Sequence, residues 1–233
     1  MSVLLLKLAG PLQSWGDHSR FMHRDTRREP TKSGVIGLLA AAQGRLRTDT
    51  ITDLAELRFG VRTDQIGTVI SDFQTEIDWR NREAEPLTHR DYLADAIFVA
   101  AVEGSTSVIT ELAEAVKSPK FPLFLGRRAC PPSGQLLIGI KENSLVECLE
   151  NEKWHASCWY KKKQPKKVQL RLSYDAHGDD PISEMVSDVP KSFDLKNREY
   201  GVRAVTHRFT SDIDNPKGWE MKDHNPFTLL GDA

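Results

Sequence analysis

The chain has 233 residues, of which 39% are hydrophobic, a net charge of −1 and three cysteines. The apolar content suffices for a folded core, and no stretch approaches the ~20 consecutive apolar residues that span a membrane. The odd cysteine count, with no CxxC pair, argues against a disulfide scaffold and a zinc knuckle and predicts a reducing, cytoplasmic setting.

The first predicted elements follow from apolar runs and their end signals. Val3–Leu8 is an apolar run that predicts a buried strand rather than a signal peptide, and a turn at 9–11 ends it. Residues 11–31 predict a long ordered loop. Thr31 or Ser33 is expected to cap a helix over 34–43, which Gly44 ends.

Further along, helices and strands alternate in an order that predicts the fold class. The expected elements are a short helix near 53–57, strands at 59–63 and 69–75, a polar insertion at 76–91, a strand at 92–102, a helix at 105–117 and a strand at 134–141. The order β-α-β-β-α-β is that of the ferredoxin-like (RRM-like) unit, an α+β fold that fixes no function alone. We expect a palm over 1–142 with the insertion at about 76–91, and a smaller strand-rich region over 143–233.

Basic residues are unevenly distributed although the chain is nearly neutral. Residues 20–32 hold five Lys/Arg against two acids, and the charged residues of 117–141 are all basic. Residues 153–171 hold seven Lys/Arg and no acid, with Lys161, Lys162, Lys163, Lys166 and Lys167 in a flexible-looking segment around Pro165. Such runs are usually solvated faces, but three of them in a neutral chain favour contact with a nucleic acid.

The aromatic stacking motif of RNA-recognition domains is absent, because the candidate strand reads Ile97–Val102 without it. Any RNA is therefore expected to be held by loops. A phosphate can bind at the start of the helix near Lys32, although the phosphate-loop spacing is missing and Gly34 and Gly37 equally suit close packing. Arg127 and Arg128 follow Gly126 and can make forked hydrogen bonds to phosphates, with two surface arginines on a turn as the alternative.

Catalytic and metal signals are weak. None of the seven histidines forms an i, i+4 pair with a carboxylate on a helix, so the sequence supports no metal or other cofactor. A metal-independent ribonuclease needs a base and cations, and His18, His23, Tyr92 and Lys32 are the available types. No spacing singles them out, and no catalytic residue is assigned.

Five segments together resemble a known family. They are Leu4–Gly16, Pro30–Leu39, Tyr92–Ala96, Phe124–Pro131, and Asp188–Asp194 followed by Arg198 and Tyr200. In this order they resemble the CasD family, the subunit of the type I-E CRISPR Cascade complex that binds the 5′ handle of the CRISPR RNA (crRNA). The resemblance spans essentially the whole chain.

The resemblance implies a ferredoxin-like palm, an inserted thumb and a C-terminal extension. It also implies crRNA, a CasC-type backbone subunit and a CasA-type large subunit as partners, with target DNA reached only through the complex and no membrane. In such complexes CasE cuts the precursor RNA, which implies an inactive protein here. A type I-C relative is itself the processing nuclease, so a metal-independent endoribonuclease stays the alternative, and a protein-interaction scaffold is a third.

We expect the RNA-binding residues to lie on loops, at the helix start and at the base of the thumb. They are Trp15, Arg24, Arg27, Arg28, Lys32, Ser33, His89, Arg90, Arg127 and Arg128. Trp15 is the least specific of them, because a tryptophan at this position also suits the core.

Overall fold

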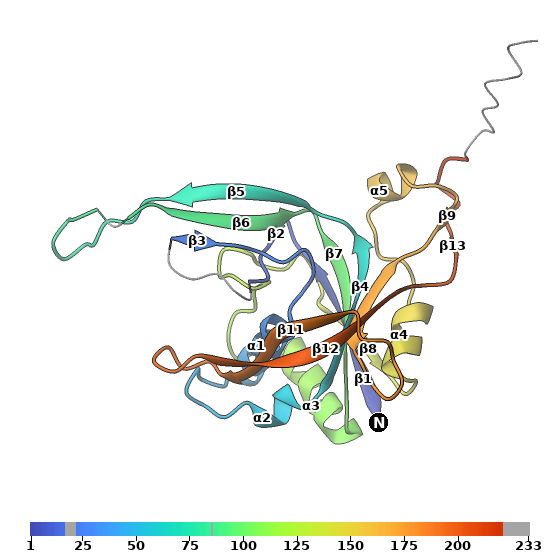
Figure 1. The fold of residues 1–233 in the computed structure, drawn as a ribbon, viewed down its shortest axis with the longest axis horizontal. Helices are drawn as coiled ribbons and strands as arrows, with labels where there is room; N and C mark the ends of the chain where they lie inside the picture. The colour runs from blue at the N-terminus through green and yellow to red at the C-terminus, as the bar shows by residue number, and fades with distance from the viewer. Residues whose placement is uncertain (17–21, 85, 221–233) are drawn as a thin grey trace, which may run out of the picture.

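A computed structural model of the chain describes residues 1–16, 22–84 and 86–220. Its centre is a sheet of seven strands in the order β11-β12-β10-β4-β7-β1-β8, with every neighbouring pair antiparallel (Figure 1). The strands are β1 (Ser2–Ala9), β4 (Arg58–Gln65), β7 (Ile97–Gly104), β8 (Leu137–Lys141), β10 (Arg171–Asp175), β11 (Glu184–Ser192) and β12 (Glu199–Phe209). The chain is therefore a mixed α+β protein, as predicted.

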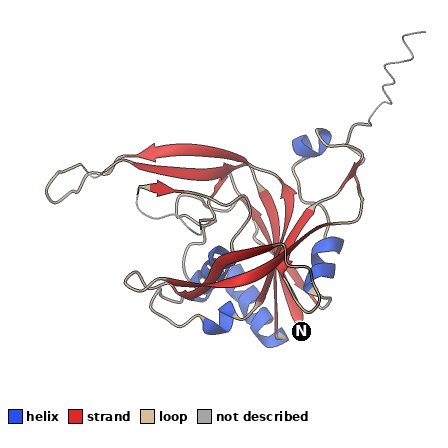
Figure 2. Cartoon of the chain, in the orientation of Figure 1, coloured by secondary structure: helices blue, strands red, loops and turns tan. Residues whose placement is uncertain are grey.

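Helices cover both faces of this sheet (Figure 2). Leu4, Leu6 and Leu8 of β1 face the main core beneath α1 (Lys32–Gln43) and α3 (Thr106–Lys117). Val3 and Leu5 face the opposite side, where α4 (Leu145–Asn151) packs. Because side chains alternate along a strand, a strand that is covered on both faces is apolar throughout. The prediction of a buried strand at Val3–Leu8 is confirmed.

Local signals set the ends of α1. The side chain of Thr31 accepts a hydrogen bond from the backbone of Gly34 at 3.2 Å, and Gly44 ends the helix with a φ of 81°. Thr31 is thus the cap, and the helix starts at Lys32, two residues before the predicted start. A second, short helix, α2 (Thr52–Ala55), follows close to its expected place.

A two-stranded hairpin, β5 (Thr68–Gln74) and β6 (Thr88–Ala94), projects from the main sheet. Along its length β6 also pairs with β2 (Leu12–Gln13) and β3 (His23–Arg24). The prediction of one strand over 92–102 is wrong, because the chain turns at Asp95, whose φ is 57°. Aspartate tolerates this left-handed conformation better than most residues. The predicted insertion at 76–91 comprises the hairpin tip and the first residues of β6.

A second projecting hairpin consists of β11 and β12, and β10 to β12 extend the same sheet to which β1 belongs. The rest of the C-terminal part contains α5 (Cys158–Lys162) and a small sheet of β9 (Lys167–Val168) and β13 (Ile213–Asp214). The predicted division at residue 142 stays a prediction. In the described part of the chain no helix is long and apolar enough to cross a membrane.

Candidate nucleic-acid interface

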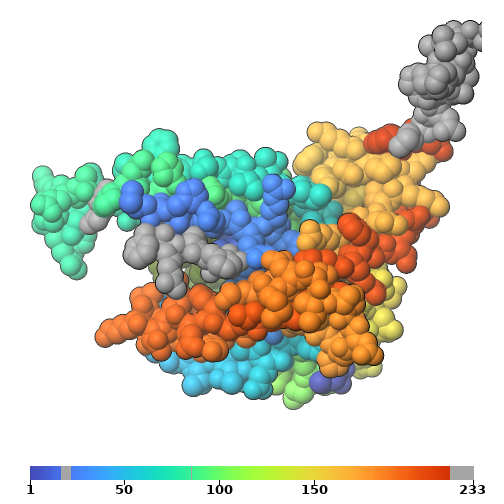
Figure 3. All heavy atoms as spheres, viewed as in Figure 1, coloured from blue at the N-terminus to red at the C-terminus, as the bar shows by residue number. Residues whose placement is uncertain are grey.

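Three segments that are distant in sequence meet beside β6. Strand β3 pairs with β6 in parallel, so that His23 lies opposite His89 and Arg24 opposite Arg90. The two imidazole rings are stacked with centroids 6.1 Å apart. In the space-filling view residues 22–30 lie between the β5–β6 and β11–β12 hairpins (Figure 3). The fold thus brings the first basic cluster beside the start of β6, towards the tip of the projecting hairpin and away from its base at Thr68 and Ala94.

Arg127 connects these segments from beneath. Its guanidinium donates to the carbonyl oxygens of Asp91 at 3.0 Å and Arg24 at 2.6 Å, and it lies 4.8 Å from the ring centre of Tyr92. A guanidinium with five donors suits this linking of backbone segments. Because these contacts use the donors of Arg127, a phosphate would have to compete with the backbone carbonyl oxygens for its guanidinium.

Gly126 has a packing role in the same loop. Its φ is 85°, and a Cβ atom built there would lie 1.6 Å from the carbonyl oxygen of Ser14. The adjacent residue Leu125 accepts a hydrogen bond from the backbone of Ser14 at 3.1 Å. Glycine is therefore required for the close approach of two protein segments.

Three arginines remain exposed around this junction. Arg24, Arg28 and Arg128 are exposed, and within residues 1–16, 22–84 and 86–220 their side chains have no hydrogen-bond or ion-pair partner. His89 is exposed as well. Arg90 is partly buried and pairs with Glu76 at 2.6 Å, while its Nε atom is buried without a partner among the described residues. We call these three exposed guanidinium groups without a partner the arginine surface: Arg24, Arg28 and Arg128.

The other predicted contact residues lie in protein contacts. Arg27 pairs with Glu184 at 2.7 Å, and Arg27 donates its backbone N–H to the carbonyl of Trp15 at 2.8 Å. The Trp15 indole is 1% exposed and packs against Gly34 of α1. Lys32 and Ser33 are buried at the start of α1. Their predicted contact with RNA stays a prediction, and it would require these groups to leave their present partners.

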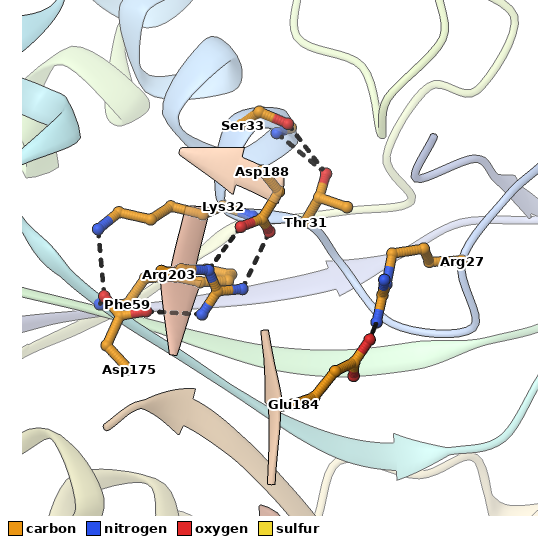
Figure 4. Close-up of polar contacts among 10 residues, drawn as sticks. Arg27, Thr31, Lys32, Ser33, Phe59, Asp175, Glu184, Asp188 and Arg203 are labelled. Atoms are coloured by element: carbon orange, nitrogen blue, oxygen red, sulfur yellow. Dashed lines mark hydrogen bonds and ion pairs between the residues drawn. The ribbon is translucent and has the colours of Figure 1, made fainter. Parts of the chain in front are cut away.

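The start of α1 is already occupied by carboxylates of the protein (Figure 4). Asp188 accepts the backbone N–H of Lys32 at 2.7 Å, and the Lys32 ammonium pairs with Asp175 at 3.1 Å. A carboxylate at a helix N-terminus satisfies free N–H groups and complements the helix dipole. The predicted phosphate position is thus filled by Asp188 in this structure.

Arg203 joins the same two carboxylates. It donates to Asp188 at 2.6 and 2.9 Å and to Asp175 at 2.6 Å. Burial opposes the charge of the guanidinium, but the two carboxylates outweigh it and raise the pKa of Arg203. We call Arg203, Asp188, Asp175 and Lys32 the Arg203 network. It fastens the β11–β12 hairpin to α1, and no sequence pattern predicts that these four residues meet.

A serine, a histidine and two glutamates also converge between β10 and β12. Ser173 donates to Glu29 at 2.6 Å, and His207 contacts Ser173 at 3.0 Å and Glu184 at 3.4 Å. Arg27 and then His207 hold the pKa of Glu184 below its usual range, although burial opposes this. The adjoining cavity has a volume of about 20 Å³, room for about one water molecule. A nucleotide does not fit there.

Of the residue types named for a ribonuclease, the described ones, His23, Tyr92 and Lys32, each lie in contacts with other parts of the protein. His23 contacts Asp25 at 2.7 Å and Asp91 at 3.2 Å, Tyr92 is buried beneath Arg127, and His18 lies outside the described residues, as does Arg20.

Among the described residues, His23, Asp25 and Asp91 are the one group that brings three potential metal-ligand atoms within 4.8 Å of one another. Both carboxylates contact the same imidazole nitrogen, so hydrogen bonding alone accounts for this cluster.

Comparison with known proteins gives consistent matches. The family model described as CRISPR-associated protein (Cas_Cas5) matches residues 3–206. The chain is 38% identical over 158 residues to the CRISPR system Cascade subunit CasD of Escherichia coli (strain K12). The match covers 59% of this chain and 70% of that protein.

Two solved structures are similar over nearly the whole chain. One, described as a crystal structure of Cas protein, is 36% identical with a TM-score of 0.70 and covers 94% of this chain and 98% of its own. The other, from a CRISPR RNA-guided surveillance complex, is 30% identical with a TM-score of 0.73 and covers 98% of both chains.

Proposed function

This chain belongs to the Cas5 family of CRISPR-associated proteins, and from that membership we propose that it is a non-catalytic RNA-binding subunit of a Cascade-type surveillance complex. In this proposal it holds the 5′ handle of crRNA at the end of the CasC-type backbone, beside a CasA-type large subunit. Target DNA is reached only through the complex, and the protein works in the cytoplasm. The observation that carries the proposal is the unpaired arginine surface.

The proposed parts of the fold follow from the strand order. The elements β1, α1, β4, β7, α3 and β8 occur in the order of a ferredoxin-like unit, with the four strands arranged β4-β7-β1-β8. We take this unit, within residues 1–142, as the palm and the β5–β6 hairpin as the thumb. Residues 143–233 are then the C-terminal region, which contributes β10 to β12 to the edge of the palm sheet.

Guanidinium groups without a protein partner are suited to a phosphate backbone. Arg24 is exposed on the short strand β3, and Arg28 and Arg128 are exposed on loops. Arg127 and Gly126 hold the segments of Arg24 and Arg128 in place. Arginine makes charge-assisted, often bidentate hydrogen bonds to phosphate. A neutral protein keeps such groups unpaired at little cost in water, and an RNA strand would neutralise all three. In this arrangement Arg127, Lys32, Ser33 and Trp15 support the surface from beneath.

The test replaces the arginine surface as a unit. The variant Arg24→Gln, Arg28→Gln, Arg128→Gln is compared with a control in which three exposed cations elsewhere are changed, Arg47→Gln, Lys117→Gln and Arg208→Gln. Affinity for a labelled repeat-derived RNA with its 5′ handle is measured across a salt series. Each lost charged contact costs ~1.5–3 kcal/mol, and the log–log salt slope falls by about 2 units for three phosphates of a single strand.

Both variants are expected to keep the thermal stability of the parent, because exposed side chains contribute little to it. If the arginine variant binds handle RNA as tightly as the control variant does, the proposed site is wrong. If it unfolds, the three residues are structural instead.

The absence of catalysis is tested separately. His207 contacts Ser173 with one ring nitrogen and Glu184 with the other, which are partners that an acid–base catalyst could use. The adjoining cavity of about 20 Å³ is too small for a nucleotide, and this supports a structural role for His207. Repeat RNA incubated with the purified chain, in EDTA or in Mg²⁺, is expected to stay intact. A single cut that His207→Ala or His23→Ala abolishes would establish the endoribonuclease alternative.

A further inference from the structure

A second positive surface lies around α5, at a distance from the arginine surface. Its members are basic or aromatic residues from α5, the turn after it, β9 and the segment after β13. We call it the α5 surface: Trp159, Lys162, Lys163, Lys167, Lys217 and Trp219. It adjoins the start of the projecting hairpin, since Ser157 donates its backbone N–H to Gln65 at 3.0 Å. The arginine surface lies towards the other end of β6 (Figure 1).

The lysine-rich segment that looks flexible in the sequence is well held in the structure. Asn215 is buried and donates its side-chain amide to the carbonyl oxygens of Lys161 at 2.8 Å and Pro165 at 2.9 Å. Trp219 donates its backbone N–H to Gln164 at 3.1 Å. These contacts fix the lysines after α5 relative to the segment after β13, so the α5 surface is preorganised.

Its charges divide into satisfied and unsatisfied groups. Lys161 turns inward to the carbonyl oxygen of Trp154 at 2.6 Å, and burial lowers the pKa of this lysine. Lys166 pairs with Glu220 at 2.7 Å. The other lysines of the segment and Lys217 have no carboxylate ion pair in the described ranges: Lys162, Lys163, Lys167 and Lys217. Asp214 is the cross-strand neighbour of Lys167 without pairing with it.

Aromatic rings lie beside the unpaired ammonium groups. The Trp159 and Trp219 side chains belong to residues that are 49% and 47% exposed. The Lys163 ammonium lies 5.2 Å from the ring centre of Trp159, and Trp219 donates its indole N–H to the carbonyl of Lys163 at 3.1 Å. Exposed indoles next to a positive groove are typical of single-stranded nucleic-acid binding, because bases stack on the rings while phosphates meet the cations.

We propose that the α5 surface binds a single-stranded polynucleotide, with the four lysines that lack a carboxylate partner on the phosphates and Trp159 stacked against a base. This goes beyond the proposed hold on the handle, because the residues and the strand contacted are different. Lysines are hydrated point charges that attract a backbone without fixing its register. The α5 surface therefore binds without a preferred sequence.

The first experiment measures binding of a labelled oligothymidylate to the full chain across a salt series. The variant Lys162→Gln, Lys163→Gln, Lys167→Gln, Lys217→Gln is compared with Lys117→Gln, Lys120→Gln, Lys191→Gln, Lys196→Gln, which removes four exposed lysines elsewhere. The salt slope should fall by about 2–3 units in the first variant only, at ~0.7 for each phosphate. Trp159→Ala should weaken binding about tenfold without changing the slope.

The second experiment uses Cys158 as a local reporter. It is the one exposed cysteine of three and lies within the α5 surface, 3.2 Å from Lys217. Oligothymidylate at about ten times its Kd should slow labelling of this thiol about tenfold, because the reagent reaches only the free fraction. The variant Arg24→Gln, Arg28→Gln, Arg128→Gln should show the same protection of Cys158. A loss of handle binding at the arginine surface can therefore be distinguished from a loss of binding at the α5 surface.

Three results would overturn the proposal. One is equal affinity and slope for the two lysine variants. Another is labelling of Cys158 that oligothymidylate leaves unchanged while polyglutamate slows it, which would identify an acidic protein partner. The third is a DNA duplex that protects the thiol as well as the single strand does, which would contradict stacking on Trp159.

Discussion

The Arg203 network provides the sharpest test of how the C-terminal hairpin is fixed. In Arg203→Met the side chain keeps much of its length and loses its charge and donors. Asp188 and Asp175 then lose three hydrogen bonds of 2.6 to 2.9 Å. Removing one partner of a buried ion pair costs ~3–5 kcal/mol, because a charge is left buried without compensation. Lys32 still contacts both carboxylates, so we expect about 3 kcal/mol.

The matched control lies on the same hairpin. Lys191 of β11 pairs with Glu199 of β12 at 2.8 Å, and both side chains are more than half exposed. An exposed pair of this kind is worth ~0–1 kcal/mol, so Lys191→Met should have little effect.

Urea denaturation of both variants measures the difference, and the double variant Arg203→Met, Asp188→Leu tests coupling. The double variant should lose at least 1 kcal/mol less than the sum of the single changes, since residues in one network couple by ~0.5–3 kcal/mol. A cost for Arg203→Met no larger than that for Lys191→Met would refute the reasoning, as would additive behaviour in the double variant.

Three further changes have defined outcomes. Gly126→Ala should lower the melting temperature, because φ is 85° and the new Cβ would collide with the carbonyl of Ser14; an unchanged value would contradict the tight packing. Trp15→Ala should cost ~3–5 kcal/mol by denaturation as a buried aromatic, whereas a residue used only for stacking on RNA would leave stability unchanged. The contact with Lys217 lowers the pKa of the Cys158 thiol. The rate of Cys158 alkylation, measured as a function of pH, should therefore reach half its maximum at a pH below the ordinary thiol pKa of 9.0. In Lys217→Gln this midpoint should move to higher pH.

Much of the architecture was readable from the sequence where the signals are local. The run Val3–Leu8, apolar except for Lys7, predicts β1, because a strand that is covered on both faces has no solvent-facing side on which polar residues would alternate. Thr31 and Gly44 bounded α1 because a cap and its helix are only a few residues apart. The sequence does not predict the strand break at Asp95, since the end of β6, Tyr92–Ala94, and most of β7, Ile97–Val102, are both apolar, and one left-handed residue turns the chain between them.

The candidate site was predictable only as a set of basic residues. Sequence counts charges but does not assign their partners, and the pairs that matter here are far apart: Lys32 meets Asp175 across 143 positions, and Arg127 meets Arg24 across 103.

The tertiary structure decides which cationic side chains pair with groups of the protein and which remain unpaired at the surface. A cation that pairs with a carboxylate or donates to carbonyl oxygens already uses its hydrogen-bonding capacity within the protein. Arg24, Arg28 and Arg128 are exposed and unpaired, so their donors remain available to a ligand.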